Sequence, residues 1–341
     1  MLLISFHETV ANLYAYDANG NLLNPLTPNV LNACKGYAFD ELRGIYAANG
    51  YLYVLNGGKD TSNILTFAIA PSTPYNCTGS PFIPSGGPID HPFAMASDGA
   101  GHAFVSNQDT NVVAALNVTS NTTATLASTS SYLQAIYPQG VFLSGTFVAS
   151  SVSPLPKVAD TTPVPLELGG LGVSETNGSA SADASDKKKK KKEKVQNSVR
   201  DVAYYAGNGG LLFVLDEPTG IARVYNPASG QPLLNSNPMS SPTHLLINGE
   251  TIYVTAGNQV MTAPIPNPYT AAMPSWVFTP LLTIDSGDAA SGMAFDDAGH
   301  FYVAGRKSQK VFVFDSTDKF SPITTWTGLP DDPEFLLYIA D

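Results

Sequence analysis

The stretch Met95-Ala-Ser-Asp-Gly-Ala-Gly-His-Ala-Phe-Val-Ser106 returns almost unchanged as Met293-Ala-Phe-Asp-Asp-Ala-Gly-His-Phe-Tyr-Val-Ala304. A duplication of this kind indicates that one supersecondary unit has been copied along the chain. In both copies an apolar segment leads into a turn rich in Asp and Gly, and a second apolar segment follows the turn. This order predicts two antiparallel strands joined by a tight turn.

Weaker copies of this unit recur along the rest of the chain, and a valine near the end of each second strand marks their period. Most of these valines are separated by about 40–50 residues, the length of a four-stranded propeller blade. The marker residues are Val54, Val105, Val148, Val214, Val254 and Val303. The one long gap contains residues 155–197, a low-complexity segment that predicts a disordered insertion. We therefore expect a single β-propeller domain over residues 1–341 with this insertion inside it.

The two ends of the chain complement each other. Residues 333–339 predict a first strand with no second strand after it, whereas residues 2–6, 12–17 and 22–26 predict second, third and fourth strands with no first. Pairing of the terminal strands would complete one blade and leave no exposed sheet edge. The sequence thus predicts an all-β propeller of seven four-stranded blades. The fourth blade, around residues 138–170, has the weakest pattern, so six blades are the alternative.

The chain resembles the NHL-like and YVTN-like β-propellers. The resemblance rests on residues 98–105 (Asp-Gly-Ala-Gly-His-Ala-Phe-Val), 297–303 (Asp-Ala-Gly-His-Phe-Tyr-Val) and 311–315 (Val-Phe-Val-Phe-Asp), and it spans nearly all of the chain outside the insertion. Lyases, lactonases and pure binding proteins share this architecture. The resemblance therefore implies a fold and leaves the activity open.

Charge is distributed unevenly along the chain. The net charge is −11, but residues 187–194 hold seven of the 17 Lys and Arg, and without them 10 basic residues face 27 acidic ones. We expect no nucleic-acid partner, because binding a phosphate backbone requires clustered Lys and Arg. No apolar run approaches the ~20 residues of a membrane span, so we expect no transmembrane segment. The lysine run is interpreted as a solvated charge block, and the protein as a monomer.

Two features bear on the compartment and point in opposite directions. The apolar stretch at residues 1–6 is too short for a signal peptide, which favours the cytoplasm. Four Asn-X-Ser/Thr sequons favour secretion instead. These sequons are at Asn76, Asn117, Asn121 and Asn177. The two cysteines, Cys34 and Cys77, could form one disulfide but neither a disulfide framework nor a four-thiolate metal site.

The candidate site lies where the first strands of the blades begin. First strands run down the central channel, so the residues that open them should meet at one mouth, and a polar residue stands at each such place. The predicted ligand-binding residues are Arg43, His91, Arg200, His244 and Glu334, with Gln139 and Ser291 at the two remaining openings. Loops between second and third strands should add His7, Glu8, Asn56, Gln108, Asp109, Asp216, Glu217 and Arg306.

A concave mouth with a few convergent polar groups is the default ligand site of such a fold. Arg43 and Arg200 suit a carboxylate or phosphate, because guanidinium groups bind these anions bidentately. Glu334 could equally neutralise one of them, and solvation or mutual ion pairing is the alternative reading of the whole set. We expect a ligand- or protein-binding propeller without catalysis or cofactor, recognising a small anionic molecule or a peptide.

A metal-dependent enzyme of the lyase or lactonase type, acting in the channel, is the alternative function. A divalent metal would be held by His7, His91 and His244, yet these residues come from the first, third and sixth expected blades and should lie apart. Calcium-dependent lactonase propellers resemble this chain in fold but use Glu, Asn and Asp ligands. Glu334 could take part, although no other strand opening supplies Asn or Asp, and Asp201 lies one residue further in.

The aspartates and histidines of the duplicated segment are of the residue types that catalyse acid–base chemistry, but we expect them to have a structural role. Asp98, Asp296 and Asp297 are repeated turn residues, and Asp favours such turns. His102 and His300 should lie at the opposite end of the channel from the candidate site. We expect both histidines to cap the turns in which they stand.

Overall fold

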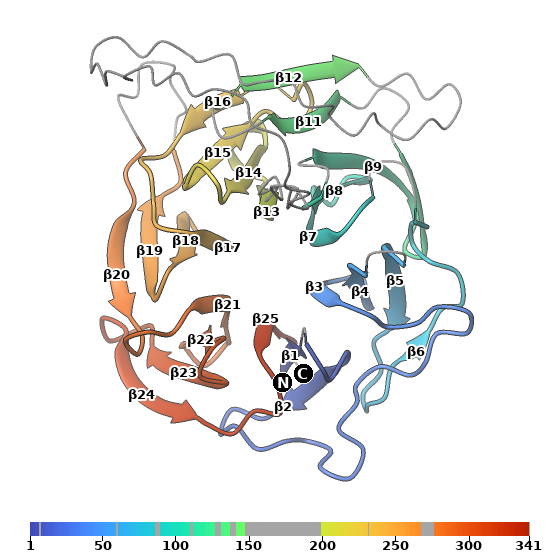
Figure 1. Cartoon of the computed structure of the whole chain (residues 1–341), viewed down its shortest axis with the longest axis vertical. Coiled ribbons are helices and arrows are strands. Elements are labelled where there is room, and N and C mark those ends of the chain that lie inside the picture. The colour runs from blue at the N-terminus through green and yellow to red at the C-terminus, as the bar shows by residue number, and fades with distance from the viewer. Residues whose placement is uncertain are drawn as a thin grey trace, which may run out of the picture.

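Six antiparallel sheets surround a central axis in the computed structural model shown in Figure 1. The structure describes residues 1–6, 8–58, 61–85, 89–109, 112–126, 131–136, 141–146, 199–230, 232–266 and 276–340. The predicted insertion at 155–197 lies outside these residues. Within the described part of the chain, no helix is long and apolar enough to cross a membrane.

Each blade starts at the axis and adds strands outward. In the blade nearest the C-terminus, the innermost strand β21 (Ala290–Phe295) is followed by β22 (His300–Gly305), β23 (Lys310–Asp315) and β24 (Ser321–Trp326). Five of the six residues of β22 are buried, whereas most of β24 is exposed. Strands covered on both faces read as short continuous apolar runs, which is why second strands were the easiest to locate in the sequence.

The same order recurs in three further four-stranded blades. The first contains β3 (Leu42–Ala48), β4 (Tyr51–Asn56), β5 (Asn63–Ala68) and β6 (Asn76–Cys77). The second contains β13 (Val199–Tyr205), β14 (Leu211–Asp216), β15 (Ile221–Tyr225) and β16 (Pro232–Asn235), with the short 3-10 turn η1 (Gly207–Gly209) after β13. The third contains β17 (Pro242–Asn248), β18 (Thr251–Ala256), β19 (Gln259–Pro264) and β20 (Thr279–Thr283).

The remaining internal sheet corrects the predicted number of blades. It contains β7 (Pro92–Ser97), β8 (His102–Asn107), β9 (Val112–Ser120) and β10 (Thr123–Leu126), and also β11 (Ser131–Ile136) and β12 (Val141–Thr146). β11 pairs with β9, and β12 pairs with β11 at the outer edge of the sheet. β7 and β13 are neighbours around the axis, so no blade stands between them (Figure 1).

The prediction of seven blades is therefore wrong, and the alternative of six blades is confirmed. The described part of the expected fourth blade, β12, extends the preceding sheet instead of opening a new one. The reason is that an outer strand and an inner strand of a propeller both give a short apolar segment. The sequence period alone does not separate the two positions.

The ends of the chain close the ring as predicted. Strand β25 (Pro333–Tyr338) is innermost and pairs with β1 (Leu2–Phe6), which pairs with β2 (Leu13–Tyr16). Leu3 stands opposite Leu337, and Ile4 stands opposite Leu336. Backbone hydrogen bonds of 2.9 Å in both directions join Met1 and Ile339. The expected fourth strand at residues 22–26 is reduced to one bridge, between Tyr16 and Leu22.

Apolar side chains fill the spaces between neighbouring blades. One cluster, which includes Leu3, Phe93 and Phe335, joins the closing blade to the blades that begin with β3 and β7. Close approach of the innermost strands also restricts side-chain size, because a Cβ atom on Gly292 would lie 2.5 Å from the backbone nitrogen of Leu336. Glycine at this position is therefore required by the packing. Toward the rim, Cys34 and Cys77 form the one disulfide that the sequence allowed, with their Cα atoms 5.3 Å apart.

The duplicated segments form matching turns after β7 and β21. Asp98 accepts a hydrogen bond from the backbone N–H of His102 at 2.9 Å, and its second oxygen lies 2.6 Å from Nδ1 of the same histidine. Asp296 repeats both contacts with His300, at 2.8 and 2.7 Å, and also accepts from the Tyr302 hydroxyl at 2.8 Å. Burial opposes the charge on each aspartate, but the hydrogen bonds outweigh it and lower the pKa of both. The predicted turn-capping role is confirmed.

Candidate functional site

The mouth of the channel holds a network of charged side chains that begins with Glu334. This residue stands near the start of β25, with 3% of its side chain exposed. Its carboxylate lies 3.7 Å from Arg43 Nη1 and 3.3 Å from Arg306 Nη1. The two arginines come from the start of β3 and from the loop between β22 and β23. Residues distant in sequence therefore meet here because the innermost strands all begin at the same end of the channel.

Arg43 is the buried cation of this network. Its guanidinium also pairs with Glu41 and lies 3.2 Å from Nε2 of His91. Only 7% of the Arg43 side chain is exposed. Burial lowers the pKa of Arg43, although Glu334 and Glu41 favour its charge. Arg43 therefore joins the carboxylates of two neighbouring blades.

His91 stands immediately before β7 and faces two carboxylates. Its ring nitrogens lie 3.3 Å from Glu41 and 3.4 Å from Asp109. Burial opposes protonation, but hydrogen bonds with Asp109 and Glu41 outweigh it and raise the pKa of His91 from 6.5 to about 9. His91 therefore carries a positive charge at neutral pH, which adds a fourth cation to Arg43, Arg200 and Arg306.

Arg200, in β13, occupies the mouth on the other side of Phe93. Its Nε donates to Glu217 at 2.6 Å, and its guanidinium lies 5.2 Å from the centre of the Phe93 ring. The Arg200 side chain is 19% exposed and that of Glu217 is 24% exposed. Stacking on an aromatic ring and one ion pair hold the guanidinium while part of it reaches solvent.

His244 lies deeper in the channel than the other predicted residues. Its ring nitrogens are 3.6 Å from Asp201 and 3.9 Å from Glu334. The ring packs against Phe335 at 4.4 Å and Phe93 at 5.3 Å between centroids. Two phenylalanines and one histidine therefore form an aromatic layer that lies below the charged network. With 2% exposure, His244 is among the most buried polar residues of the protein.

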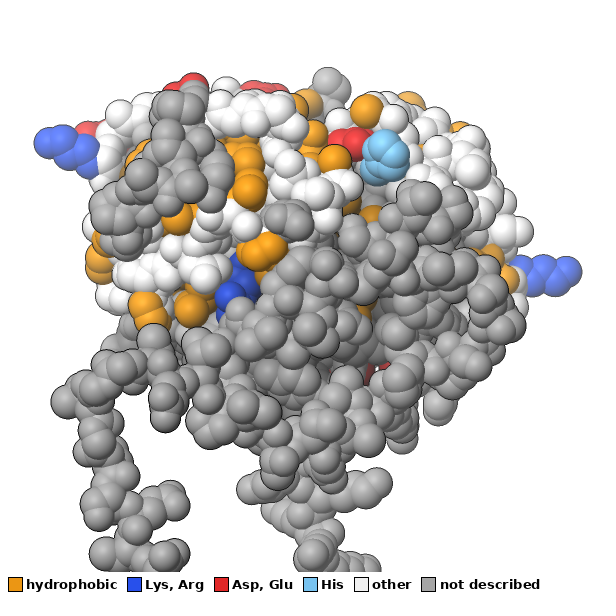
Figure 2. All heavy atoms as spheres, turned by 90° about the horizontal axis from the view of Figure 1, so that it is seen from above, with side chains coloured by type: hydrophobic (Ala, Val, Ile, Leu, Met, Phe, Trp, Pro, Cys, Tyr) orange, Lys and Arg blue, Asp and Glu red, His pale blue; other side chains and the backbone are white. Residues whose placement is uncertain are grey.

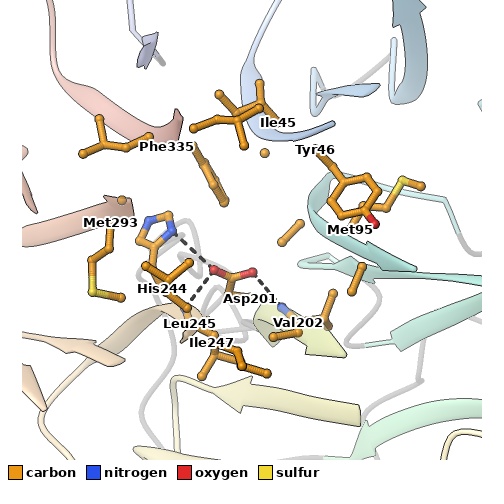
Figure 3. A pocket seen from close by; sticks show the side chains of 18 of the residues that line it. Ile45, Tyr46, Met95, Asp201, Val202, His244, Leu245, Ile247, Met293 and Phe335 are labelled. Atoms are coloured by element: carbon orange, nitrogen blue, oxygen red, sulfur yellow. Dashed lines mark hydrogen bonds and ion pairs between the residues drawn. The ribbon is translucent and has the colours of Figure 1, made fainter. Parts of the chain in front are cut away.

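A cavity of about 270 Å³ lies on the far side of this layer. Figure 3 shows His244 and Asp201 facing each other among the residues that line it, with apolar side chains around them. Asp201 also accepts hydrogen bonds of 2.8 Å from the backbone N–H groups of Val202 and Leu245. The predicted ligand site lies at the opposite end of the channel, so this cavity is an addition to the prediction.

The structure therefore brings all five predicted ligand-binding residues together around the channel. From the loop residues it adds Glu8, which lies 3.6 Å from Arg306, together with Asp109 and Glu217. Three other predicted loop residues make contacts that stabilise the fold and do not join the charged network. Asp216 pairs with the buried Arg223, Asn56 holds the segment before β3, and Gln108 is buried. Ser291 hydrogen-bonds the backbone of Pro333, while His7 and Gln139 lie outside the described residues.

Two residues of the site were missed as parts of the mouth. Glu41 stands two positions before Arg43, outside the row of residues directly preceding the strands. Asp201 was noted only as lying one residue further in, yet it is the partner of His244. An acidic residue within two positions of a basic one at the start of an inner strand is the signal that could have found both.

The proposed metal ligands do not form a cluster. His91 and His244 contact different carboxylates, on either side of Arg43 and Glu334, and His7 is not described. Among the residues with described positions, no three His, Cys, Asp or Glu side chains converge as a metal ion requires.

Figure 2 looks onto the edge of the ring. On this face, backbone, uncharged polar side chains and hydrophobic side chains cover most of the visible described surface, and Lys and Arg side chains stand apart from one another.

Comparison with known proteins supports the fold alone. No protein-family model and no curated protein sequence matches the chain. A solved periplasmic gluconolactonase from Pseudomonas aeruginosa is similar, with 14% identity, a TM-score of 0.55, and coverage of 99% of this chain and 98% of that one. The Cps50 (Swd1) β-propeller domain of Myceliophteria thermophila is also similar, with 10% identity, a TM-score of 0.52, and coverage of 97% and 87%.

A protein from Lactobacillus plantarum matches with 13% identity, a TM-score of 0.55, and coverage of 96% and 82%. The neighbours include a gluconolactonase and a β-propeller domain, so the β-propeller resemblance is confirmed at the level of the fold. Identities this low carry no activity over to this chain.

Proposed function

We propose that the protein is a non-catalytic binding propeller that recognises the carboxylate of a small ligand or peptide at the channel mouth. Arg200 and Arg306 would contact this carboxylate. Glu334, which Arg43 also contacts, would hold Arg306 in place, Glu217 and Phe93 would hold Arg200, and His244 would close the bottom of the site. The narrower NHL-like or YVTN-like assignment, the single domain with its insertion at 155–197, and the monomeric state belong to the same proposal.

The observation that carries the proposal is the difference in exposure among the three arginines. The side chain of Arg43 is 7% exposed, whereas those of Arg200 and Arg306 are 19% and 29% exposed. Arg200 pairs with the partly exposed Glu217, and Arg306 pairs with the exposed Glu8 in addition to the buried Glu334. Pairs with exposed carboxylates contribute little stability. A ligand carboxylate can therefore compete with Glu217 and Glu8 for these guanidinium groups at small cost, and it can bind a guanidinium bidentately.

The carboxylates around the mouth narrow the class of ligand. Glu8 and Asp109 are 54% and 53% exposed and form the outer edge of the network. They would repel a ligand of purely negative charge and attract an ammonium group. A ligand that carries both charges, such as an amino acid or a short peptide, matches this arrangement best.

Isothermal titration calorimetry with short peptides, in free-acid and C-terminally amidated forms, tests the proposal. We expect binding only to free acids, and a loss of tenfold to a hundredfold in affinity in Arg200→Met and Arg306→Met, because each removes a charge-assisted hydrogen bond. Lys310→Met is the matched control, since the Lys310–Asp285 pair has the same exposures, 29% and 54%, as the Arg306–Glu8 pair.

Two outcomes would contradict the proposal. Equal affinity for acids and amides, or unchanged affinity in both arginine variants, would remove the carboxylate from the recognition. Hydrolysis of gluconolactone above the uncatalysed rate, lost in His91→Gln, would replace the binding function with the enzymatic alternative.

A further inference from the structure

The cavity on the far side of the aromatic layer is a second site, separate from the mouth. It lies along the middle and far end of the innermost strands β3, β7, β13, β17, β21 and β25. Residues at its inner end, such as His244 and Phe335, are buried, whereas Tyr46, Tyr204 and Ile247 at its other end are partly exposed. The cavity therefore opens away from Arg200 and Arg306.

Apolar and aromatic groups form most of the wall. Ile45, Leu245 and Ile247 supply branched aliphatic side chains, and Met95 and Met293 supply thioethers (Figure 3). Thioether sulfur makes favourable contacts with aromatic rings, and methionine adapts to irregular shapes. This wall suits a flat ring. At about 270 Å³ the space is ample, because a cavity of about 150 Å³ already holds benzene.

One polar residue at the inner end has ionic neighbours but, within the described structure, no hydrogen bond from its ring. His244 is 2% exposed and lines the cavity, yet among the described residues neither of its ring nitrogens has a hydrogen bond. The carboxylate of Asp201 lies 3.6 Å away and already accepts two backbone hydrogen bonds. A buried polar group without a hydrogen bond is costly, so a ligand that supplies one is favoured.

The charges near His244 decide which polar group fits. Asp201 and Glu334 face its two nitrogens, and they would repel a ligand carboxylate. An ammonium group has donors but no acceptor, so it cannot accept a hydrogen bond from the ring N–H of His244. A hydroxyl group can both donate and accept, and it can therefore hydrogen-bond a ring nitrogen of His244 without adding a net charge.

We propose that this cavity binds a small uncharged aromatic molecule with one hydroxyl group, which hydrogen-bonds His244. The aromatic layer and the charged network separate this ligand from any ligand at the mouth. The two sites can therefore be tested independently, and the failure of one leaves the other intact.

Ligand-observed NMR titration of the full-length protein with benzyl alcohol, benzylamine and benzoate is the test. We expect saturable binding of benzyl alcohol with a Kd of about 1 mM or below, which is reasonable for a ligand of this size. Benzoate should bind at least tenfold more weakly, and benzylamine no more tightly than the alcohol. Absence of saturable binding, or a preference for benzoate or benzylamine, would overturn the proposal.

Three variants locate the site. Ile247→Trp adds volume at the partly exposed end of the cavity and should abolish binding of benzyl alcohol. Ala298→Trp adds the same bulk to an exposed turn outside the cavity and should leave the Kd unchanged. His244→Phe keeps an aromatic ring but removes the hydrogen bond, so affinity should fall about tenfold. If that variant does not fold, Ile247→Trp alone decides, and unchanged binding in it would refute the site.

Discussion

Replacing Glu334 by Gln should destabilise the whole ring, because this carboxylate is the shared partner of two arginines. At an effective dielectric constant of about 20, the attractions to Arg43 at 3.7 Å and Arg306 at 3.3 Å amount to about 4.5 and 5 kcal/mol. Removing the charge also removes the cost of burying it, which offsets most of this sum. Since breaking a buried pair typically costs about 3–5 kcal/mol, we expect the free energy of unfolding to fall by about 3 kcal/mol.

Urea denaturation at pH 7, followed by far-UV circular dichroism at low and high NaCl, measures this loss. The effect should persist at high salt, because Glu334 is 3% exposed and is poorly screened. The control is Asp285→Asn, which breaks an exposed pair with Lys310 and should cost about 0.5 kcal/mol or less. A double-mutant cycle with Arg43→Met should give a coupling of about 1–3 kcal/mol. Equal losses in Glu334→Gln and Asp285→Asn would refute the reasoning.

Three further predictions concern other parts of the ring. The pKa of His91 is raised to about 9, so its contribution to folding stability should be complete below pH 6.5 and disappear as the pH rises through 9. A ring-proton NMR titration of His91 and pH-dependent melting of His91→Gln check this. A titration midpoint near 6.5 would contradict it. Asp296→Ala should cost about 2–3 kcal/mol in urea denaturation and more than Asp98→Ala, which lacks the tyrosine contact; equal costs would argue against that contact. Removing residues 333–341 deletes β25 and should abolish cooperative unfolding, whereas a two-state transition in the truncated chain would disprove the role of the closure.

The sequence was sufficient for the features that depend on a local pattern. Two features were predicted in this way: the pairing of residues 2–6 with 333–338, and the Asp–His turns. Both follow from the order of the apolar segments and from the residue types in the turns. The number of blades was not, because β12 has the pattern of a strand, and no local feature says whether that strand faces the channel or the rim.

For the candidate site, too, the sequence predicted what depends on local position and missed what depends on contacts between blades. Residues that open the inner strands were found from their position, since every blade begins at the same end of the channel. Which of their charges are buried depends on the partners that the closed ring provides, such as Glu41 for Arg43 and Asp201 for His244. The cavity beyond the aromatic layer is lined by side chains from six strands, so no single segment of the sequence predicts it.

The closure also has a consequence for how the protein is made. Leu2, Leu3, Ile4 and Phe6 are almost completely buried, and β25, which covers one edge of them, begins roughly 330 residues later in the chain. At roughly 5–20 residues per second, synthesis of this interval takes about 16–65 seconds. Throughout this time the nascent chain carries an apolar β edge on β1 whose partner strand does not yet exist. Chaperones that hold such segments should therefore have their largest effect on yield before β25 has been synthesised, and little effect once the ring has closed.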